Sequence, residues 1–217
     1  GSLREYDQPL SVYELAASIG PGLAKAAVAG RVDGILVDCE FMIETDARVS
    51  IVTPQEPDGL EILRRSCVLM LAMAVKQLHP QVQLHTGTAL GDGFFHEFSA
   101  ERSLTQTELI EARMQALAAT NHSIRRQGKT PLYRLGNVES TTAGPHVPAT
   151  RVLQAFTLDH ISDTLPQRIY GTCWSCQQEL DSWRALPHVM IVSMDERQAD
   201  YAQPVTEALR RSGVHAR

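Results

Sequence analysis

The stretch Ile19-Gly20-Pro21-Gly22-Leu23-Ala24-Lys25-Ala26, followed by Ala29-Gly30-Arg31-Val32-Asp33-Gly34, decides the fold of the first part of the chain. Upstream, Ser11 and Glu14 have the spacing of a capping box, so a helix is predicted to begin there. Gly20-Pro21-Gly22 ends this helix and allows a second helical turn. Asp33-Gly34 between apolar flanks is a strong signal for a tight hairpin turn. We therefore expect a helix next to a hairpin.

Short apolar runs after this turn predict strands near residues 36–37, 41–43 and 49–52. A helix that packs on a sheet rich in hairpins is a β-grasp arrangement. Pro54 to Asp58 forms a short Pro/Asp linker, which suggests that the first domain ends near residue 56.

The segment after the linker combines apolar helices with strands. Residues 60–78 are apolar on most faces and predict a core helix, whereas residues 82–98 alternate around Gly91-Asp92-Gly93 and predict strands joined by a tight turn. Thr105-x-x-Glu108 is a second capping box and predicts a helix over 109–119. The expected class is therefore α+β.

The remaining sequence is less regular. Residues 127–150 show little pattern and are predicted to be loop, and 170–174 is taken as a strand. Near the end, 189–192 predicts a buried strand and 199–211 an amphipathic helix that stops at Gly213. This βα unit needs further strands to cover its edges.

Composition restricts the possible functions. The chain has 217 residues, of which 43% are hydrophobic and 21% charged, and no apolar run approaches the ~20 residues of a membrane span. No signal-peptide pattern opens the sequence, so we expect a cytoplasmic protein without a membrane partner. The net charge of −5 means that any RNA binding depends on a local basic surface, for which the arginine pairs 64–65, 125–126 and 210–211 are candidates.

The first stretch quoted above resembles the TGS domain of threonyl-tRNA synthetases. Gly59-Leu60-Glu61-Ile62 and Asp92-Gly93-Phe94-Phe95, together with Gly144-Pro145-His146-Val147-Pro148 and Arg168-Ile169-Tyr170-Gly171-Thr172, are similar to the editing domain that follows it. The resemblance implies a TGS-like domain at 1–56, a shortened editing-like domain at 57–184, and a partial anticodon-binding-like unit at 185–217. On this comparison the aminoacylation domain is absent, so we expect a chain that does not charge tRNA.

The resemblance also implies where the editing site lies. In the family, this site uses two histidines one helical turn apart and a cysteine followed four positions later by a histidine. The corresponding residues here are Arg65, Leu69, Thr142 and His146, so three of the four family side chains are replaced. Arginine cannot accept a proton and leucine cannot orient water, so the family hydrolysis is expected to be lost.

Several of these residues remain candidates for other roles. The resemblance implies ligand-binding positions at Arg65, Thr142, His146, Asp92 and Phe94. His146 either retains a catalytic or ligand-contacting role or braces the Gly-Pro loop, and Arg65 either holds an anion or turns outward. Cys67 is either a buried packing residue or a nucleophile, if Arg65 and His146 lower its pKa.

Cys173-x-x-Cys176 invites a metal or redox interpretation, but no second such pair exists and residues three apart on a strand face opposite sides. No metal or cofactor is therefore expected. The first functional hypothesis is a binding or regulatory protein that recognises tRNA, aminoacyl-tRNA of the threonine or serine class, or a small ligand in the former editing cleft. The alternative is a stand-alone aminoacyl-tRNA deacylase or an aminoacyl transferase in a dedicated pathway.

Overall fold

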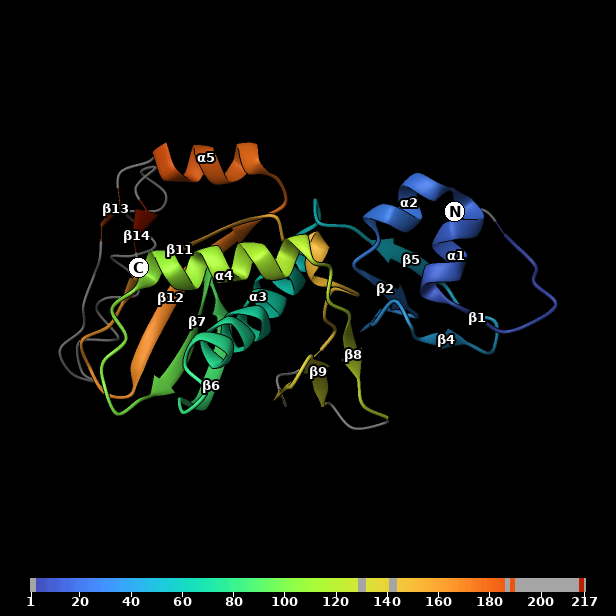
Figure 1. The fold of residues 1–217 in the computed structure, drawn as a ribbon. Helices are drawn as coiled ribbons and strands as arrows, with labels where there is room; N and C mark the ends of the chain where they lie inside the picture. The colour runs from blue at the N-terminus through green and yellow to red at the C-terminus, as the bar shows by residue number, and fades with distance from the viewer. Residues whose placement is uncertain (1–2, 129–131, 141–143, 186–187, 190–214, 217) are drawn as a thin grey trace, which may run out of the picture. The chain divides into compact units, whose positions relative to one another are not determined.

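The computed structural model describes residues 3–128, 132–140, 144–185, 188–189 and 215–216, the last two pairs by their backbone only (Figure 1). The chain divides into two units, Gly1–Ser175 and Cys176–Arg217. The first unit contains the predicted domain at 1–56 and most of the predicted domain at 57–184, and the boundaries near residues 56 and 184 remain predictions.

The chain begins with the helical pair that the sequence predicts. Helix α1 (Val12–Ile19) starts at the expected capping box, in which the Glu14 amide donates to Ser11 Oγ at 3.1 Å and the Ser11 amide donates to Glu14 Oε2 at 2.7 Å. Helix α2 (Pro21–Ala26) follows directly, with the proline in its first turn, where the missing N–H is not needed.

These helices lie next to a three-stranded antiparallel sheet of order β3-β2-β5. The strands are β2 (Ala29–Val32), β3 (Ile35–Val37) and β5 (Val49–Val52), and β1 (Leu10–Ser11) pairs separately with β4 (Met42–Ile43). Asp33 and Gly34 both have positive φ, 48° and 87°, which confirms the predicted hairpin turn. A Cβ on Gly30 would come within 2.7 Å of the Val12 methyl groups, so glycine allows α1 to lie close to β2. The first domain is therefore a β-grasp fold.

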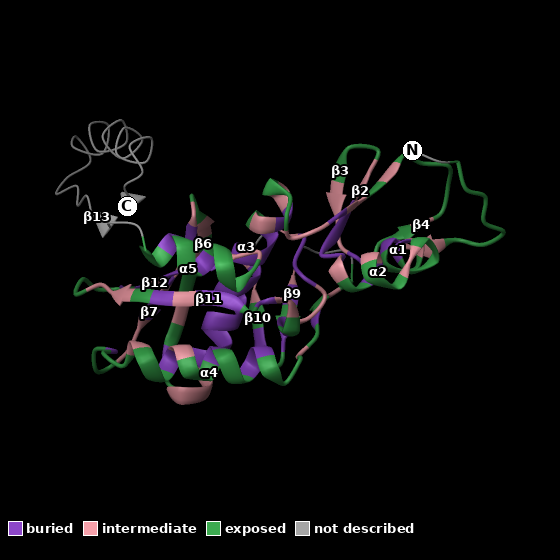
Figure 2. Cartoon of the chain, turned by 90° about the horizontal axis from the view of Figure 1, so that it is seen from above, coloured by how far each residue is buried: buried purple, intermediate pink, exposed green. Residues whose placement is uncertain are grey.

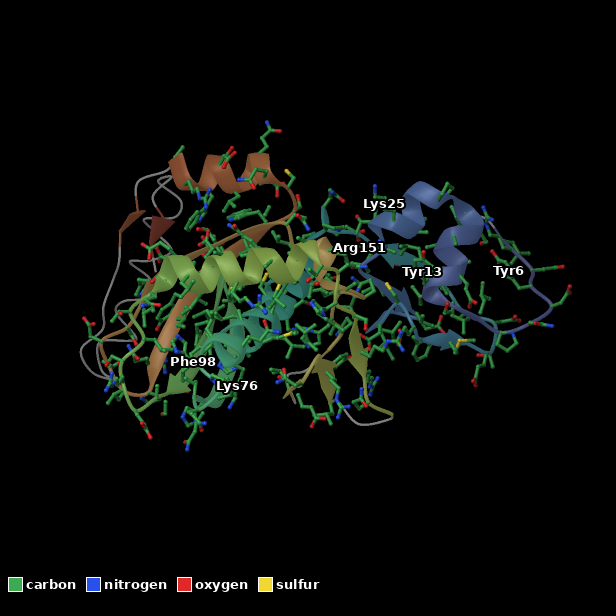
Figure 3. The ribbon with its side chains drawn as sticks, in the orientation of Figure 1. Tyr6, Tyr13, Lys25, Lys76, Phe98 and Arg151 are labelled. Atoms are coloured by element: carbon green, nitrogen blue, oxygen red, sulfur yellow. The ribbon has the colours of Figure 1, made fainter. Side chains whose placement is uncertain are left out.

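The larger part of this unit is built on α3 (Pro57–Leu78), which is buried along most of its length (Figure 2). Helix α3 packs against three strands of an antiparallel sheet of order β11-β12-β7-β6, and α4 (Thr107–Ala119) packs against α3 and β11. The strands of this sheet are β6 (Gln83–Leu90), β7 (Gly93–Ser99), β11 (Ala155–Ile161) and β12 (Gln167–Trp174). Phe98 on β7 is 1% exposed and is among the largest buried side chains of this core (Figure 3).

Two local predictions are wrong. Helix α4 begins at Thr107 with Gln106 as its N-cap, not at the predicted capping box of Thr105. The physical reason lies in β12, because the Gln167 side chain binds both the amide and the carbonyl of Leu104, at 2.7 and 3.2 Å. These buried tertiary bonds hold the segment before the helix in a non-helical path.

The predicted loop over 127–150 is not wholly irregular either. Strands β8 (Ile124–Arg126), β9 (Tyr133–Leu135) and β10 (Val138–Ser140) form an antiparallel sheet of order β10-β9-β8, and the short 3-10 turn η1 (Thr150–Val152) follows. Each strand has three residues, which is too short to show a reliable alternation in sequence.

The second unit begins with α5 (Gln177–Ala185), a helix that the sequence did not predict. Strand β13 (His188–Val189) begins near the predicted strand at 189–192 and pairs in parallel with β14 (His215–Ala216). The predicted helix over 199–211 and its stop at Gly213 lie outside the described residues. Within the described part of the chain, no helix is both long and apolar enough to cross a bilayer.

Candidate functional site

His146 lies on the loop between β10 and η1, and two separate parts of the chain hold it. Its backbone amide donates to Asp38 Oδ1 at 3.2 Å, and its ring makes an edge contact with Tyr133, with centroids 4.4 Å apart. The residue is only 2% exposed. The position of His146 is therefore fixed by its surroundings, and both roles that the sequence left open for it, bracing the loop and contacting a ligand, stay predictions.

Ser66 on α3 fixes the orientation of this imidazole ring. Its hydroxyl donates to the Ile62 carbonyl at 2.7 Å and accepts from the Val147 amide at 3.0 Å, and His146 Nδ1 lies 3.3 Å away. Because the single hydroxyl proton goes to Ile62, Nδ1 must be the donor to Ser66. On this hydrogen-bond network, Nδ1 carries a proton.

Asp38, at the end of β3, joins the β-grasp domain to this loop. Tyr133 Oη donates to Asp38 Oδ2 at 2.7 Å, so the carboxylate binds both Tyr133 and the His146 amide. Burial, followed by this contact with Asp38, raises the pKa of the Tyr133 hydroxyl, which remains a donor at neutral pH. A Cβ on Gly144 would lie 1.8 Å from Tyr133 Oη, so only glycine lets the loop pass this ring.

Arg65 does not turn outward. Its Nη1 donates to the Gly144 carbonyl at 2.9 Å, its Nη2 forms an ion pair with Glu61, and its side chain is 18% exposed. The guanidinium therefore connects α3 to the His146 loop. Leu69, one turn further along α3, is buried in the core.

Cys67 is placed for packing and not for nucleophilic attack. Its side chain is fully buried next to Cys173 of β12, and burial, followed by contact with Cys173, raises the pKa of its thiol well above the usual value. The sequence allowed Arg65 and His146 to lower this pKa, but the structure gives the opposite direction. Cys173 is buried whereas Cys176 is exposed, so the two thiols of the Cys-x-x-Cys pair do not share one environment.

The other predicted ligand residues lie elsewhere. Phe94 is 2% exposed, fills the core next to Gly171, and is not among the residues that line the cavity described below. Asp92 lies in the β6–β7 turn, where its carbonyl accepts a hydrogen bond from the Thr172 hydroxyl. Thr142 is outside the described residues. Across the part of the chain that is described, no three His, Cys, Asp or Glu side chains are arranged to hold a metal ion.

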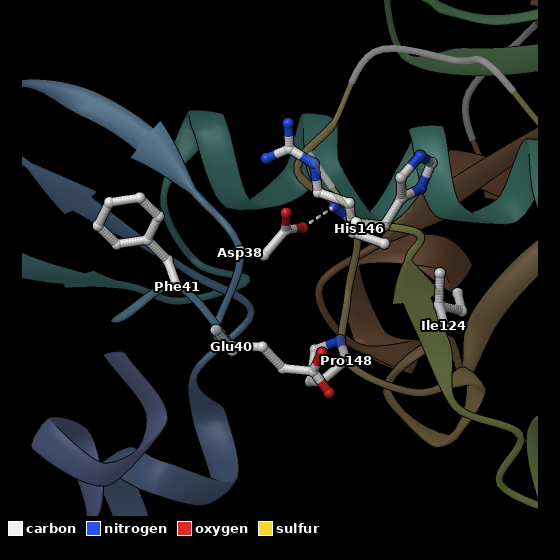
Figure 4. A pocket seen from close by; sticks show the side chains of 9 residues that line it. Asp38, Glu40, Phe41, Ile124, His146 and Pro148 are labelled. Atoms are coloured by element: carbon white, nitrogen blue, oxygen red, sulfur yellow. Dashed lines mark hydrogen bonds between the residues drawn. The ribbon is translucent and has the colours of Figure 1, made fainter. Parts of the chain in front are cut away.

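A cavity of about 330 Å³ lies beside His146 (Figure 4). Residues from the β3–β4 segment line one wall, and residues from β8 and the His146 loop line the other. The lining residues are Asp38, Cys39, Glu40, Phe41, Ile124, Arg126, Gly128, His146 and Pro148. His146 is the only predicted site residue among them. Asp38 and Glu40 were not predicted as site residues, and their only sequence signal is that acidic residues directly follow an apolar strand. Arg126 belongs to one of the arginine pairs that the sequence offered as a basic surface for RNA.

Comparison with known proteins agrees with this architecture. Residues 1–53 match the TGS domain family. Threonine–tRNA ligase of Halorhodospira halophila is 38% identical over 223 residues, which cover 84% of this chain and 35% of the ligase. The ligase of Legionella pneumophila strain Corby matches at 38% identity and that of Methylibium petroleiphilum at 39%, each with the same coverage. The chain is a homologue of threonine–tRNA ligase.

The homology to threonine–tRNA ligase includes the TGS domain and the editing-type domain, as the sequence motifs predicted. The chain spans about a third of the length of the curated relatives it matches, as their 35% coverage shows.

Proposed function

We propose that this chain binds the aminoacylated 3′ end of a tRNA of the threonine or serine class, in the cavity beside His146, and leaves the ester bond intact. The homologues are named as ligases of threonine and tRNA, which supports a tRNA ligand. The proposal rests mainly on whether the side chains at the predicted editing positions can activate water. At the predicted editing positions, Arg65 and Leu69 offer neither a base nor a metal ligand, which leaves His146 as the one described residue of that set that can accept a proton.

The cysteine thiols do not replace the missing groups. Cys39 lines the cavity, but burial, followed by the charges of Asp38 and Glu40, raises the pKa of its thiol to about 12. Cys67 is fully buried and does not line the cavity. A thiol in this state is protonated at neutral pH and is a poor nucleophile. Binding without turnover is therefore the function that these groups support best.

A local cationic surface is available for the RNA backbone. Arg126 of β8 lines the cavity, and Arg125 of β8 lies opposite Arg134 of β9 in the strand register. Arg134 pairs with Glu139, and Arg125 lies 4.0 Å from Glu40. Phosphate groups that approach Arg125 and Arg126 would be bound despite the net charge of −5, because the Debye length of about 8 Å at physiological salt keeps this effect local.

The proposal is tested with the whole chain and with seryl-tRNA, threonyl-tRNA, deacylated tRNA and an unrelated RNA of the same length. We expect tighter binding of the two aminoacyl-tRNAs and a binding constant that falls with salt. Arg126→Ala should weaken binding and reduce the salt slope by about one, whereas the exposed control Arg102→Ala should change neither. Equal affinity for the unrelated RNA would refute the proposal.

The same experiment addresses the alternative activity. Incubation of the complexes shows whether the ester bond survives. Ester loss or transfer of the aminoacyl group that disappears in His146→Ala would favour the deacylase or transferase and would remove the non-hydrolytic proposal.

A further inference from the structure

We draw no further inference here: the strongest candidate, the row of Phe95, Tyr170, His160 and Arg168 across strands β7, β11 and β12, carries nothing, because its rings already contact one another and Arg168, and nothing in the described part of the chain shows what covers this face of the sheet.

Discussion

Replacement of Ser66 by alanine measures how strongly α3 holds the His146 loop. The substitution leaves the buried Val147 amide without its acceptor at 3.0 Å and His146 Nδ1 without its partner at 3.3 Å. A buried polar group that loses its partner costs about 1–3 kcal/mol. The higher helix propensity of alanine offsets about 0.5 kcal/mol of this loss in stability. We therefore expect Ser66→Ala to lower the free energy of unfolding by about 2–4 kcal/mol.

The assay is urea unfolding followed by far-ultraviolet circular dichroism, with hydrogen exchange of the Val147 amide to locate the effect. A loss of this size should lower the melting temperature by roughly 5–10 °C in a chain of this length and should accelerate exchange at Val147. Ser182→Ala is the matched control, because its hydroxyl makes the same bond to the carbonyl four residues earlier, at 2.8 Å, on an exposed face. A Ser66→Ala variant that is as stable as this control, with slow exchange at Val147, would refute the reasoning.

Three further predictions concern other parts of the structure. Gly144→Ala places a Cβ 1.8 Å from Tyr133 Oη and should destabilise the chain by about 1–3 kcal/mol in urea unfolding, whereas Gly20→Ala, with no atom within 4 Å, should not. Burial lowers the pKa of His96, so His96 of the unfolded state takes up a proton before His96 of the folded state as the pH falls. The free energy of unfolding should therefore decrease below about pH 6.5, by at most ~1.4 kcal/mol per pH unit, and this decrease should be smaller in His96→Gln. Iodoacetamide should modify the exposed Cys176 rapidly in the native protein, and the buried Cys39, Cys67 and Cys173 only after unfolding. Mass spectrometry locates the modified thiols, and rapid modification of a second cysteine in the native protein would contradict this prediction.

Local chemistry made the first domain predictable from sequence. The capping box at Ser11 and the turn at Asp33-Gly34 each depend on residues within a few positions of one another, and both occur as predicted. Thr105 had an equally good local signal and failed, because Gln167 binds Leu104 from 63 residues away. A local cap contributes about 1 kcal/mol, which two buried tertiary hydrogen bonds can exceed.

The candidate site was predictable only at His146, whose motif marks it. Asp38 lies 108 residues from His146 and 95 residues from Tyr133, and Ser66 lies 81 residues from Val147. No periodicity or spacing relates such positions, since their approach depends on how α3 and the β-grasp domain pack. Phe94 shows the reverse case, because this motif residue is buried in the core and does not line the cavity.

Arg65 links helix α3 to the loop that carries His146. The sequence left open whether this cation holds a ligand or faces solvent, and the structure shows it bound to the Gly144 carbonyl and Glu61. An imidazole is shorter and has one donor per ring nitrogen, so it could not make both contacts from the same position on α3. Arg65 thus has a structural role, because it fixes the loop that carries His146. The carboxylates of the cavity come from the β-grasp domain and do not depend on α3 for their charge. The cavity beside His146 can therefore keep its walls although Arg65 and Leu69 on α3 offer no group that activates water.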